Sequence, residues 1–404
     1  MALTKGKSPF YPGQPVPFEL FVGRLSQINH ILKRGAGQVA EGKPSAVFVQ
    51  GEYGIGKSSV AGITQQIASE QYILHPIYAS LGSATDINEV GQAILRGTIS
   101  SIESDPTRGE KIKAFLSKYL GEQQLFGGLT IRFDRLKEDA PSVANGLLPF
   151  LTETFSRLTE TGSKGIFLVL DEINGITADK KFSTMIKELI DSNALSVNPL
   201  PLFLMLCGVE ARRHDMIAQH QPVERIFDVV HIDKMPDREV EEFFTKAFHS
   251  VSMEVQEDGL KILVEYSAGF PKIMHLIGDN AFWTDSDGVI DEHDAIIAVV
   301  DAADGVGKKY VDKQVLRELK SREYHSILKK IAMDGPNVMT FRRSEVSKKL
   351  SSTEKRKFDN LLQKLKRLHV IEGVEASRGE YRFTSQIVRL YIWLNSRRKG
   401  DSLE

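Results

Sequence analysis

The segment GEYGIGKSS, residues 51–59, combines residue types and a spacing that suit the binding of phosphate. Its glycines let consecutive backbone N–H groups turn towards phosphate oxygens. Lys57 supplies a positive charge, and Ser58 can place its hydroxyl on Mg²⁺. The pattern predicts a P-loop between a strand and a helix. Its expected binding residues are Gly51, Gly54, Gly56, Lys57, Ser58 and Ser59.

Two acidic residues follow the apolar run GIFLVL at 165–170. A metal bound to phosphate needs a carboxylate at the tip of another buried strand, and Asp171 is the candidate. Glu172 comes one residue later and should point differently, which makes it the candidate general base. Such a pair often only caps a helix. Combined with the P-loop, it predicts phosphoryl transfer with Mg²⁺ held by Ser58 and Asp171.

Strands and helices are predicted to alternate around these motifs. Apolar, β-branched runs indicate strands at 45–50, 72–79, 165–170 and 201–206, with a shorter one at 128–133. Apolar residues at helical spacing indicate helices at 88–102 and 144–158. Strands that are separated by helices imply parallel crossovers. The prediction is therefore an α/β fold whose parallel sheet is covered on both faces.

The two ends of the chain differ from this core. Four prolines between Pro9 and Pro17 predict an extended arm. After about residue 234 the apolar residues recur at three-to-four spacing, which predicts a small helical domain. The predicted organisation is an arm at 1–20, a nucleotide-binding core at 21–233, a helical lid at 234–311 and a basic domain at 312–404.

The basic domain contains 22 Lys and Arg against 12 Asp and Glu, although the whole chain has a net charge of −1. Three helical patterns and a hairpin with its turn at 377–379 predict a winged helix. In that fold the third helix enters the major groove and the wing touches the backbone. The predicted contacts to double-stranded DNA are Lys355, Arg356, Lys357, Lys364 and Arg378. A winged helix that binds protein, or only packs on its own ATPase domain, is the alternative.

Composition argues against several other classes of protein. The single cysteine, Cys207, cannot form an intrachain disulfide or a multi-cysteine zinc site. The longest apolar stretches are shorter than the roughly 18 residues that span a bilayer. The first residues lack the apolar segment of a secretory signal. We therefore expect a cytoplasmic protein that does not bind a membrane.

Two further motifs, FVGR at 21–24 and GFPK at 269–272, complete a family pattern. With the P-loop and the Asp-Glu pair, they make the chain resemble an AAA+ ATPase. The resemblance is to the branch shared by origin-recognition-type initiators and STAND signalling ATPases. It covers residues 18–310 and, more loosely, the basic domain. It implies an AAA+ P-loop parallel sheet core with a helical lid, followed by a winged-helix domain.

The resemblance also implies roles on the nucleotide side. It places FVGR, which is Phe21, Val22, Gly23 and Arg24, near the adenine of ATP. It places Lys272 where a second sensor contacts the γ-phosphate, although arginine is more usual there.

Further positions are implied at the γ-phosphate and at a subunit boundary. Arg225, in the segment 223–232, resembles the arginine finger that reaches a neighbouring subunit's site, with Arg212 and Arg213 as alternatives. Cys207 ends the predicted strand beside Asp171, where a polar sensor usually stands, and simple packing is its alternative role.

These observations predict an ATP-dependent molecular switch. ATP and Mg²⁺ would bind between core and lid, favour self-association into a homo-oligomer and control DNA engagement, and hydrolysis to ADP and phosphate would reset the switch. Two alternatives stay open. One is a STAND-type signalling or defence ATPase whose basic domain binds protein. The other is a mobile-element or replication adaptor that recruits a transposase or helicase.

Overall fold

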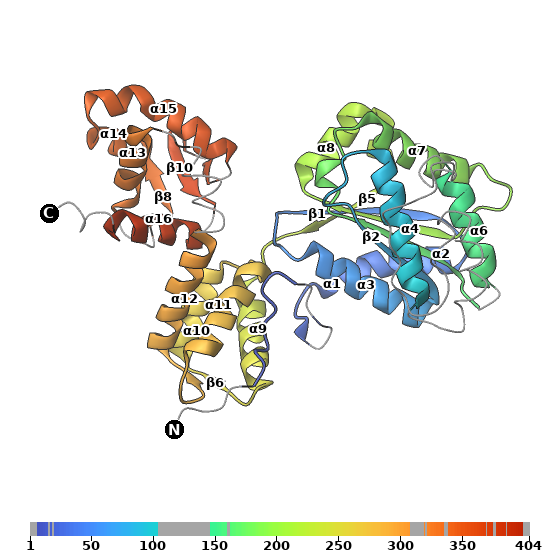
Figure 1. Cartoon of the computed structure of the whole chain (residues 1–404), viewed down its shortest axis with the longest axis horizontal. Coiled ribbons are helices and arrows are strands. Elements are labelled where there is room, and N and C mark those ends of the chain that lie inside the picture. Colours follow the sequence, from blue (N-terminus) through green and yellow to red (C-terminus); the bar gives the residue numbers. More distant parts are fainter. Residues whose placement is uncertain are drawn as a thin grey trace, which may run out of the picture. The chain divides into compact units, whose positions relative to one another are not determined.

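The chain forms two compact units, Gly23–Asp233 and Met1–Val22 with Lys234–Glu404, which we name the core unit and the lid unit. They are shown in a computed structural model (Figure 1). The residues that the structure describes are 6–14, 17, 20–103, 146–159, 162–307, 319, 321–334, 338–368, 370–374, 377–384 and 386–398.

Five parallel strands form the sheet of the core unit, in the order β2-β3-β4-β1-β5 (Figure 1). They are β1 Ser45–Gly51, β2 Leu74–Ser80, β3 Gly165–Asp171, β4 Leu202–Gly208 and β5 Asp228–Ile232. The parallel α/β prediction is confirmed, as are its four main strands. The edge strand β5 was not predicted, because its sequence DVVHI has no continuous apolar run. The predicted strand at 128–133 lies outside the described residues.

One face of the sheet is covered by the first helices of the chain. These are α1 Leu25–Ile31, η2 Leu32–Ala36, α2 Gly37–Ala40 and α3 Lys57–Tyr72. Phe167 and Phe203 stack on this face with ring centroids 4.2 Å apart. A Cβ on Gly35 would lie 2.0 Å from the Phe203 ring, so η2 packs directly on these aromatic side chains. Gln65 of α3 donates hydrogen bonds to carbonyl oxygens of both β2 and β3.

The opposite face is covered by later helices, and a second apolar cluster lies beneath them. They are α4 Ile87–Glu103, α6 Leu147–Thr159, α7 Lys180–Ala194 and α8 Glu210–Gln219 (Figure 1). The helices predicted at 88–102 and 144–158 correspond to α4 and α6. Successive residues of a strand point to opposite faces of the sheet, and each face is covered by one layer of helices. Both faces of β3 and β4 are therefore buried and largely apolar.

Four helices form the first part of the lid unit, as the three-to-four spacing predicted. They are α9 Asp237–His249, α10 Glu257–Ser267, α11 Pro271–Thr284 and α12 Glu292–Val306. The short strands β6 Glu254–Val255 and β7 Val289–Ile290 pair between them. Asp291 and Asp294 form a capping box that begins α12.

The N-terminal arm is anchored in these helices. The Phe10 ring is buried, with its centroid 5.0 Å from that of Phe248 and 5.9 Å from that of Phe243. The backbone N–H of Tyr11 donates to His275 Nδ1 at 3.1 Å. Burial lowers the pKa of His275 to about 4, so the ring is a neutral acceptor at neutral pH. The proline pattern predicted an extended arm but not this anchor.

The last part of the lid unit combines helices with a small antiparallel sheet of order β8-β10-β9. Its elements are α13 Arg322–Ala332, β8 Thr340–Arg342, α14 Arg343–Lys348, α15 Ser352–Arg367, β9 Ile371–Gly373, β10 Glu380–Phe383 and α16 Gln386–Arg398. The final helix α16 packs against α12. A Cβ on Gly307 would lie 2.2 Å from the Tyr391 ring, so glycine permits this close approach.

Candidate functional site

The P-loop connects the end of β1 to the first residue of α3. Gly54 and Gly56 have φ values of 80° and 96°, in the region that favours glycine. A Cβ on Gly51 would lie 2.5 Å from the carbonyl oxygen of Ile232, so a side chain cannot fit there. The backbone therefore requires glycine at all three positions. Ser58 and Ser59 follow in the first turn of α3 and are partly buried.

Lys57 is held within the loop itself. Its Nζ donates to the carbonyl oxygens of Gly51 at 3.0 Å and Glu52 at 2.8 Å. Burial lowers the pKa of Lys57, and the nearby charges of Asp171 and Glu172 oppose that shift. The two carboxylates therefore help to keep a partly buried ammonium charged.

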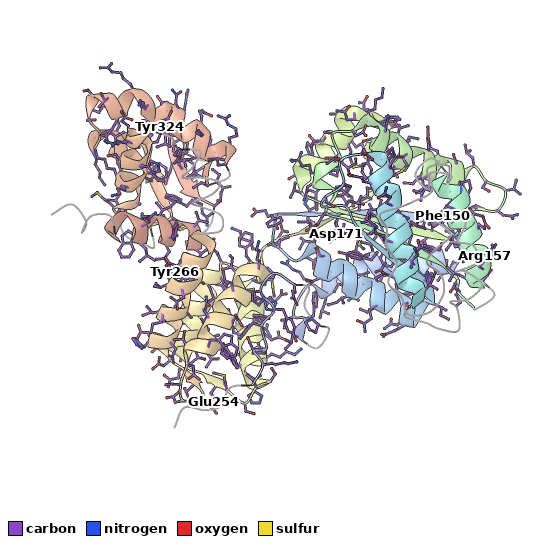
Figure 2. The ribbon with its side chains drawn as sticks, viewed as in Figure 1. Phe150, Arg157, Asp171, Glu254, Tyr266 and Tyr324 are labelled. Carbon is purple, nitrogen blue, oxygen red and sulfur yellow. The ribbon has the colours of Figure 1, made fainter. Side chains whose placement is uncertain are left out.

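Asp171 ends β3 in the middle of the core unit and is buried (Figure 2). Its Oδ1 accepts a hydrogen bond from the backbone N–H of Glu172 at 2.8 Å. Its Oδ2 accepts a hydrogen bond from the Tyr78 hydroxyl. The pKa of Tyr78 is raised by burial and by the charge of Asp171, so the hydroxyl keeps its proton and donates it. The Ser58 side chain lies close enough to the same hydroxyl to lower the pKa of Tyr78, against the larger effect of burial.

Glu172 has a φ of 57°, which directs its side chain away from that of Asp171. Its Oε2 lies 3.4 Å from the Ser80 hydroxyl at the end of β2. A Cβ on Gly82 would lie 2.3 Å from the same carboxylate oxygen. Glycine at position 82 therefore leaves the room in which the Glu172 carboxylate lies.

Cys207 lies beside these groups on β4. Leu206 pairs with Leu170 in the sheet, so Cys207 is level with Asp171 and shares its face. The side chain is completely buried, and burial raises the pKa of its thiol well above the usual range. A protonated, buried thiol fits the packing alternative better than that of a polar sensor.

The three candidate finger arginines differ in their contacts. Arg212 pairs with Asp215 at 2.8 Å. Arg213 donates from Nε to Gln50 Oε1 at 2.9 Å. Arg225 is exposed at the end of η4 Gln221–Arg225, and no ion pair holds it within the described residues. Of the three, Arg225 is the one whose guanidinium is available to another molecule.

The predicted adenine-side and second-sensor residues are divided between the units. Phe21 and Val22 belong to the lid unit, and Gly23 and Arg24 begin the core unit. Arg24 is buried at the N-cap of α1, with a φ of 62°. Lys272 is exposed in the first turn of α11 in the lid unit. The structure thus brings Lys57, Ser58, Asp171, Glu172 and Cys207 together in one unit.

The glycine of GFPK has a packing role. Gly269 has a φ of 73°, and a Cβ there would lie 2.3 Å from the carbonyl oxygen of Met235. The backbone N–H of Met235 donates to the Gly269 carbonyl at 2.9 Å. The Gly269 backbone therefore holds Met235, just before α9 in the lid unit, against the turn that precedes α11.

The predicted DNA contacts on α15 and the hairpin fall into two groups. Lys355, Arg356 and Arg378 are exposed. Lys357 is engaged within the domain, since its Nζ lies 2.8 Å from Glu323 Oε2. Lys364 is partly buried.

Three polar residues that the sequence patterns did not single out also belong to the site. Tyr78 and Ser80 alternate with apolar residues at the end of β2 and share the face of Asp171. Gln50 is buried next to the P-loop and contacts both Arg213 and His231. The alternation in β2 was a usable signal. The pairing of β2 with β3, which places Tyr78 and Ser80 beside Asp171, is not visible in the sequence.

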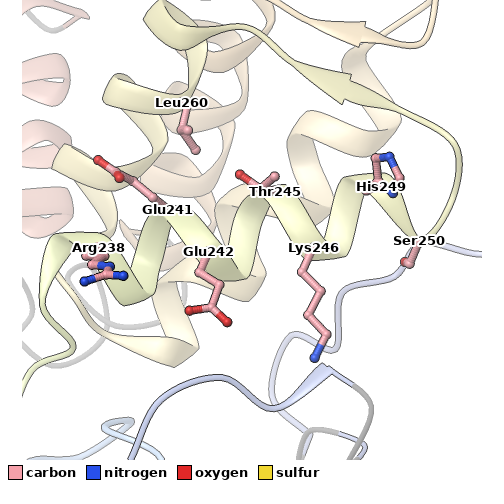
Figure 3. A pocket seen from close by; sticks show the side chains of 8 residues that line it. All are labelled: Arg238, Glu241, Glu242, Thr245, Lys246, His249, Ser250 and Leu260. Carbon is pink, nitrogen blue, oxygen red and sulfur yellow. The ribbon is translucent and has the colours of Figure 1, made fainter.

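An open pocket lies along α9 in the lid unit, apart from the P-loop residues (Figure 3). Its lining carries charges of both signs and ends at Leu260 of α10. It contains none of the residues predicted to bind nucleotide. The lining residues are Arg238, Glu241, Glu242, Thr245, Lys246, His249, Ser250 and Leu260.

Comparison with known proteins shows what the part of the chain that carries this site is similar to. Residues 20–205 match the model of the AAA ATPase domain family. No curated protein sequence matches the chain. Within the described ranges, every helix is too short or too polar to span a membrane.

Two solved structures share the fold over nearly the whole chain. The ORC2 protein of Aeropyrum pernix, in ADPNP-ADP complexes, is 12% identical, with 98% of each chain covered and a TM-score of 0.59. A Walker-type ATPase of Pyrococcus abyssi is 18% identical, with 95% of this chain and 99% of that chain covered and a TM-score of 0.58. Residues 20–205 of this chain therefore match an AAA ATPase domain, and its fold is similar to that of the ORC2 protein and the Walker-type ATPase.

Proposed function

We propose that this protein is an AAA+ molecular switch. It binds ATP with Mg²⁺, hydrolyses ATP to ADP and phosphate, and couples the nucleotide state to self-association and to engagement of double-stranded DNA. The observation that carries the proposal is the meeting of Lys57, Asp171 and Glu172 at the carboxyl ends of the strands, where the two carboxylates raise the pKa of Lys57 against the effect of burial.

Each residue at that edge has a chemical task. The N–H groups of the loop and the Lys57 ammonium bind the phosphates. The Ser58 hydroxyl and the Asp171 carboxylate fit Mg²⁺, because they are oxygen ligands that both lie beside the Tyr78 hydroxyl. Bound Mg²⁺ would neutralise charge on the phosphates. Glu172 accepts the proton of the attacking water.

The exposed face of α15 supports DNA as the partner. Arg356, Asn360, Gln363 and Arg367 follow one another at spacings of four, three and four, opposite the buried apolar seam of the helix. All four are exposed, and no hydrogen bond or ion pair engages them within the described residues. These side chains are of the types that contact phosphates and base edges.

The acidic residues of α15 do not oppose this role. Asp359 is paired with Arg343 through two hydrogen bonds of 2.7 and 2.8 Å. Glu354 is buried and paired with Lys330. The helix therefore presents an uncompensated positive face, and Arg378 extends it at the hairpin tip. In a winged helix the third helix enters the major groove, and this face of α15, the third helix of the domain, would then engage DNA.

The nucleotide part is tested by calorimetry with ATP. Lys57→Ala should abolish ATP binding or weaken it severely, because it removes the charge that offsets the phosphates. Lys43→Ala, an exposed lysine of the same unit, is the matched control and should bind like wild type. Equal ATP affinity in wild type and Lys57→Ala would refute the assignment of the P-loop.

The DNA part is tested by duplex binding at several salt concentrations. The double variant Lys355→Glu with Arg356→Glu should weaken duplex binding. The slope of log K against log salt should also become shallower, by about 0.9 for each lost phosphate contact. Arg238→Glu with Lys246→Glu makes the same charge change on α9 and is the control (Figure 3). ATP binding should survive in both. If wild type binds no duplex at low salt, the DNA assignment is wrong and a protein partner replaces it.

A further inference from the structure

Tyr78 connects the two residues that are expected to hold magnesium. Its hydroxyl donates to Asp171 Oδ2 and lies beside the Ser58 side chain. Tyr78 belongs to β2, whereas Ser58 lies in the first turn of α3 and Asp171 ends β3. The Tyr78 side chain thus lies among three separate elements at the carboxyl ends of the strands.

The register of the sheet explains how the ring reaches this place. Tyr78 pairs with Val169, two residues before Asp171, while Ser80 pairs with Asp171 itself. Neighbouring strands lie about 4.8 Å apart and rise about 3.3 Å per residue, so such diagonal neighbours are about 8 Å apart between Cα atoms, within reach of an aromatic side chain. A smaller polar residue at position 78 could not bridge that distance.

Both oxygens of the Asp171 carboxylate are held. Oδ1 accepts from the backbone N–H of Glu172, and Oδ2 accepts from Tyr78. The first bond comes from the backbone and survives any side-chain change. The second comes from Tyr78 alone among the side chains that the structure describes around Asp171, so it sets the rotation of the carboxylate.

We propose that Tyr78 is a positioning residue, which orients the Asp171 carboxylate and the Ser58 hydroxyl towards a common divalent cation. The proposal rests on the ATP and Mg²⁺ function proposed above. Tyr78 itself takes no part in the transfer of the phosphoryl group. Its loss weakens the binding of the metal while leaving the contacts between the loop and the phosphates in place.

The experiment compares ATP affinity with and without Mg²⁺. Tyr78→Phe keeps the ring and removes only the hydroxyl. In EDTA its ATP affinity should equal that of wild type. With Mg²⁺ the gain in affinity should be smaller by about tenfold, which corresponds to one hydrogen bond to a charged group. Binding of Mn²⁺ to the ATP complex, followed by electron paramagnetic resonance, should weaken by a similar factor.

A matched control separates this role from a structural one. Tyr72→Phe makes the same change at the end of α3, where the ring contacts Gly37. It should leave both affinities unchanged. Equal loss of ATP affinity in EDTA and in Mg²⁺ would make Tyr78 a packing residue and overturn the proposal. Tighter Mn²⁺ binding in Tyr78→Phe would also overturn it, since the hydroxyl would then compete with the cation.

The outcomes also distinguish this proposal from the proposed function. If wild-type protein binds no ATP under either condition, the function fails. If wild type binds ATP more tightly with Mg²⁺ and Tyr78→Phe matches it in both conditions, only the role of Tyr78 fails.

Discussion

At the scale of single residues, Glu172 shows how backbone conformation creates a functional position. Its left-handed φ turns the carboxylate away from Asp171 and towards Ser80 and Gly82. We expect Glu172→Gln to retain ATP binding and to lose turnover by about 100-fold or more, because the amide keeps the shape but is a much poorer base. Phosphate release measures turnover, and calorimetry measures ATP affinity.

Glu188→Gln, an exposed glutamate of α7 in the same unit, is the control for this substitution and should turn over like wild type. Normal turnover in Glu172→Gln would show that another group activates the water.

At the scale of elements, the start of α15 depends on one buried carboxylate. Glu354 accepts hydrogen bonds from Lys330, Ser326 and the backbone N–H of Ser351. Burial opposes its ionisation, but these hydrogen bonds outweigh burial and lower the pKa of Glu354 to about 2. The folded pKa lies below the ordinary value, so the stabilisation is complete above about pH 4.5 and is lost as the pH falls towards 2.

We therefore expect Glu354→Gln to reduce the free energy of unfolding at pH 7 by about 2 kcal/mol, the size of one hydrogen bond to a charged group. The difference from wild type should shrink below about pH 4.5, where wild-type Glu354 begins to lose its advantage. Denaturant titrations of the full chain between pH 7 and pH 3 measure this. Glu345→Gln on the exposed face of α14 is the control. A difference that does not depend on pH would show that the carboxylate charge is not what stabilises this end of α15.

At the scale of the whole molecule, the chain passes between its two units twice, after Val22 and after Asp233. The arm residue Phe10 belongs to the core of the lid unit, so the arm is held in that unit before the first of these connections. Arg225 is exposed in the core unit and is available to a second copy. We expect Arg225→Ala to retain ATP affinity and to lower turnover by about 1000-fold, as the loss of a finger in trans does.

Mixing tests whether the guanidinium acts on another subunit. A mixture of Arg225→Ala and Glu172→Gln chains should regain part of the wild-type phosphate release. In such a mixture, a site with an intact Glu172 on the Arg225→Ala chain can receive Arg225 from a neighbouring Glu172→Gln chain. With assembly verified by light scattering, no recovery at any mixing ratio would make Arg225 a structural residue.

The sequence by itself determined the elements with strong local patterns. Glycine spacing around Lys57, the apolar run before Asp171 and the three-to-four spacing after residue 234 each depend on neighbouring residues alone. These predicted the parallel sheet and the AAA+ resemblance. The edge strand β5 was missed because its sequence DVVHI contains no continuous apolar run.

The tertiary structure alone decided which side chains meet. Strand order β2-β3 and its register place Tyr78 beside Asp171, although 93 positions separate them in the chain. The same applies to Lys357, a predicted DNA contact near the start of the third helix, whose pairing with Glu323 is not visible in the sequence. The physical reason is that pairing between strands and helices is set by the packing of the whole core, which no local window of sequence contains.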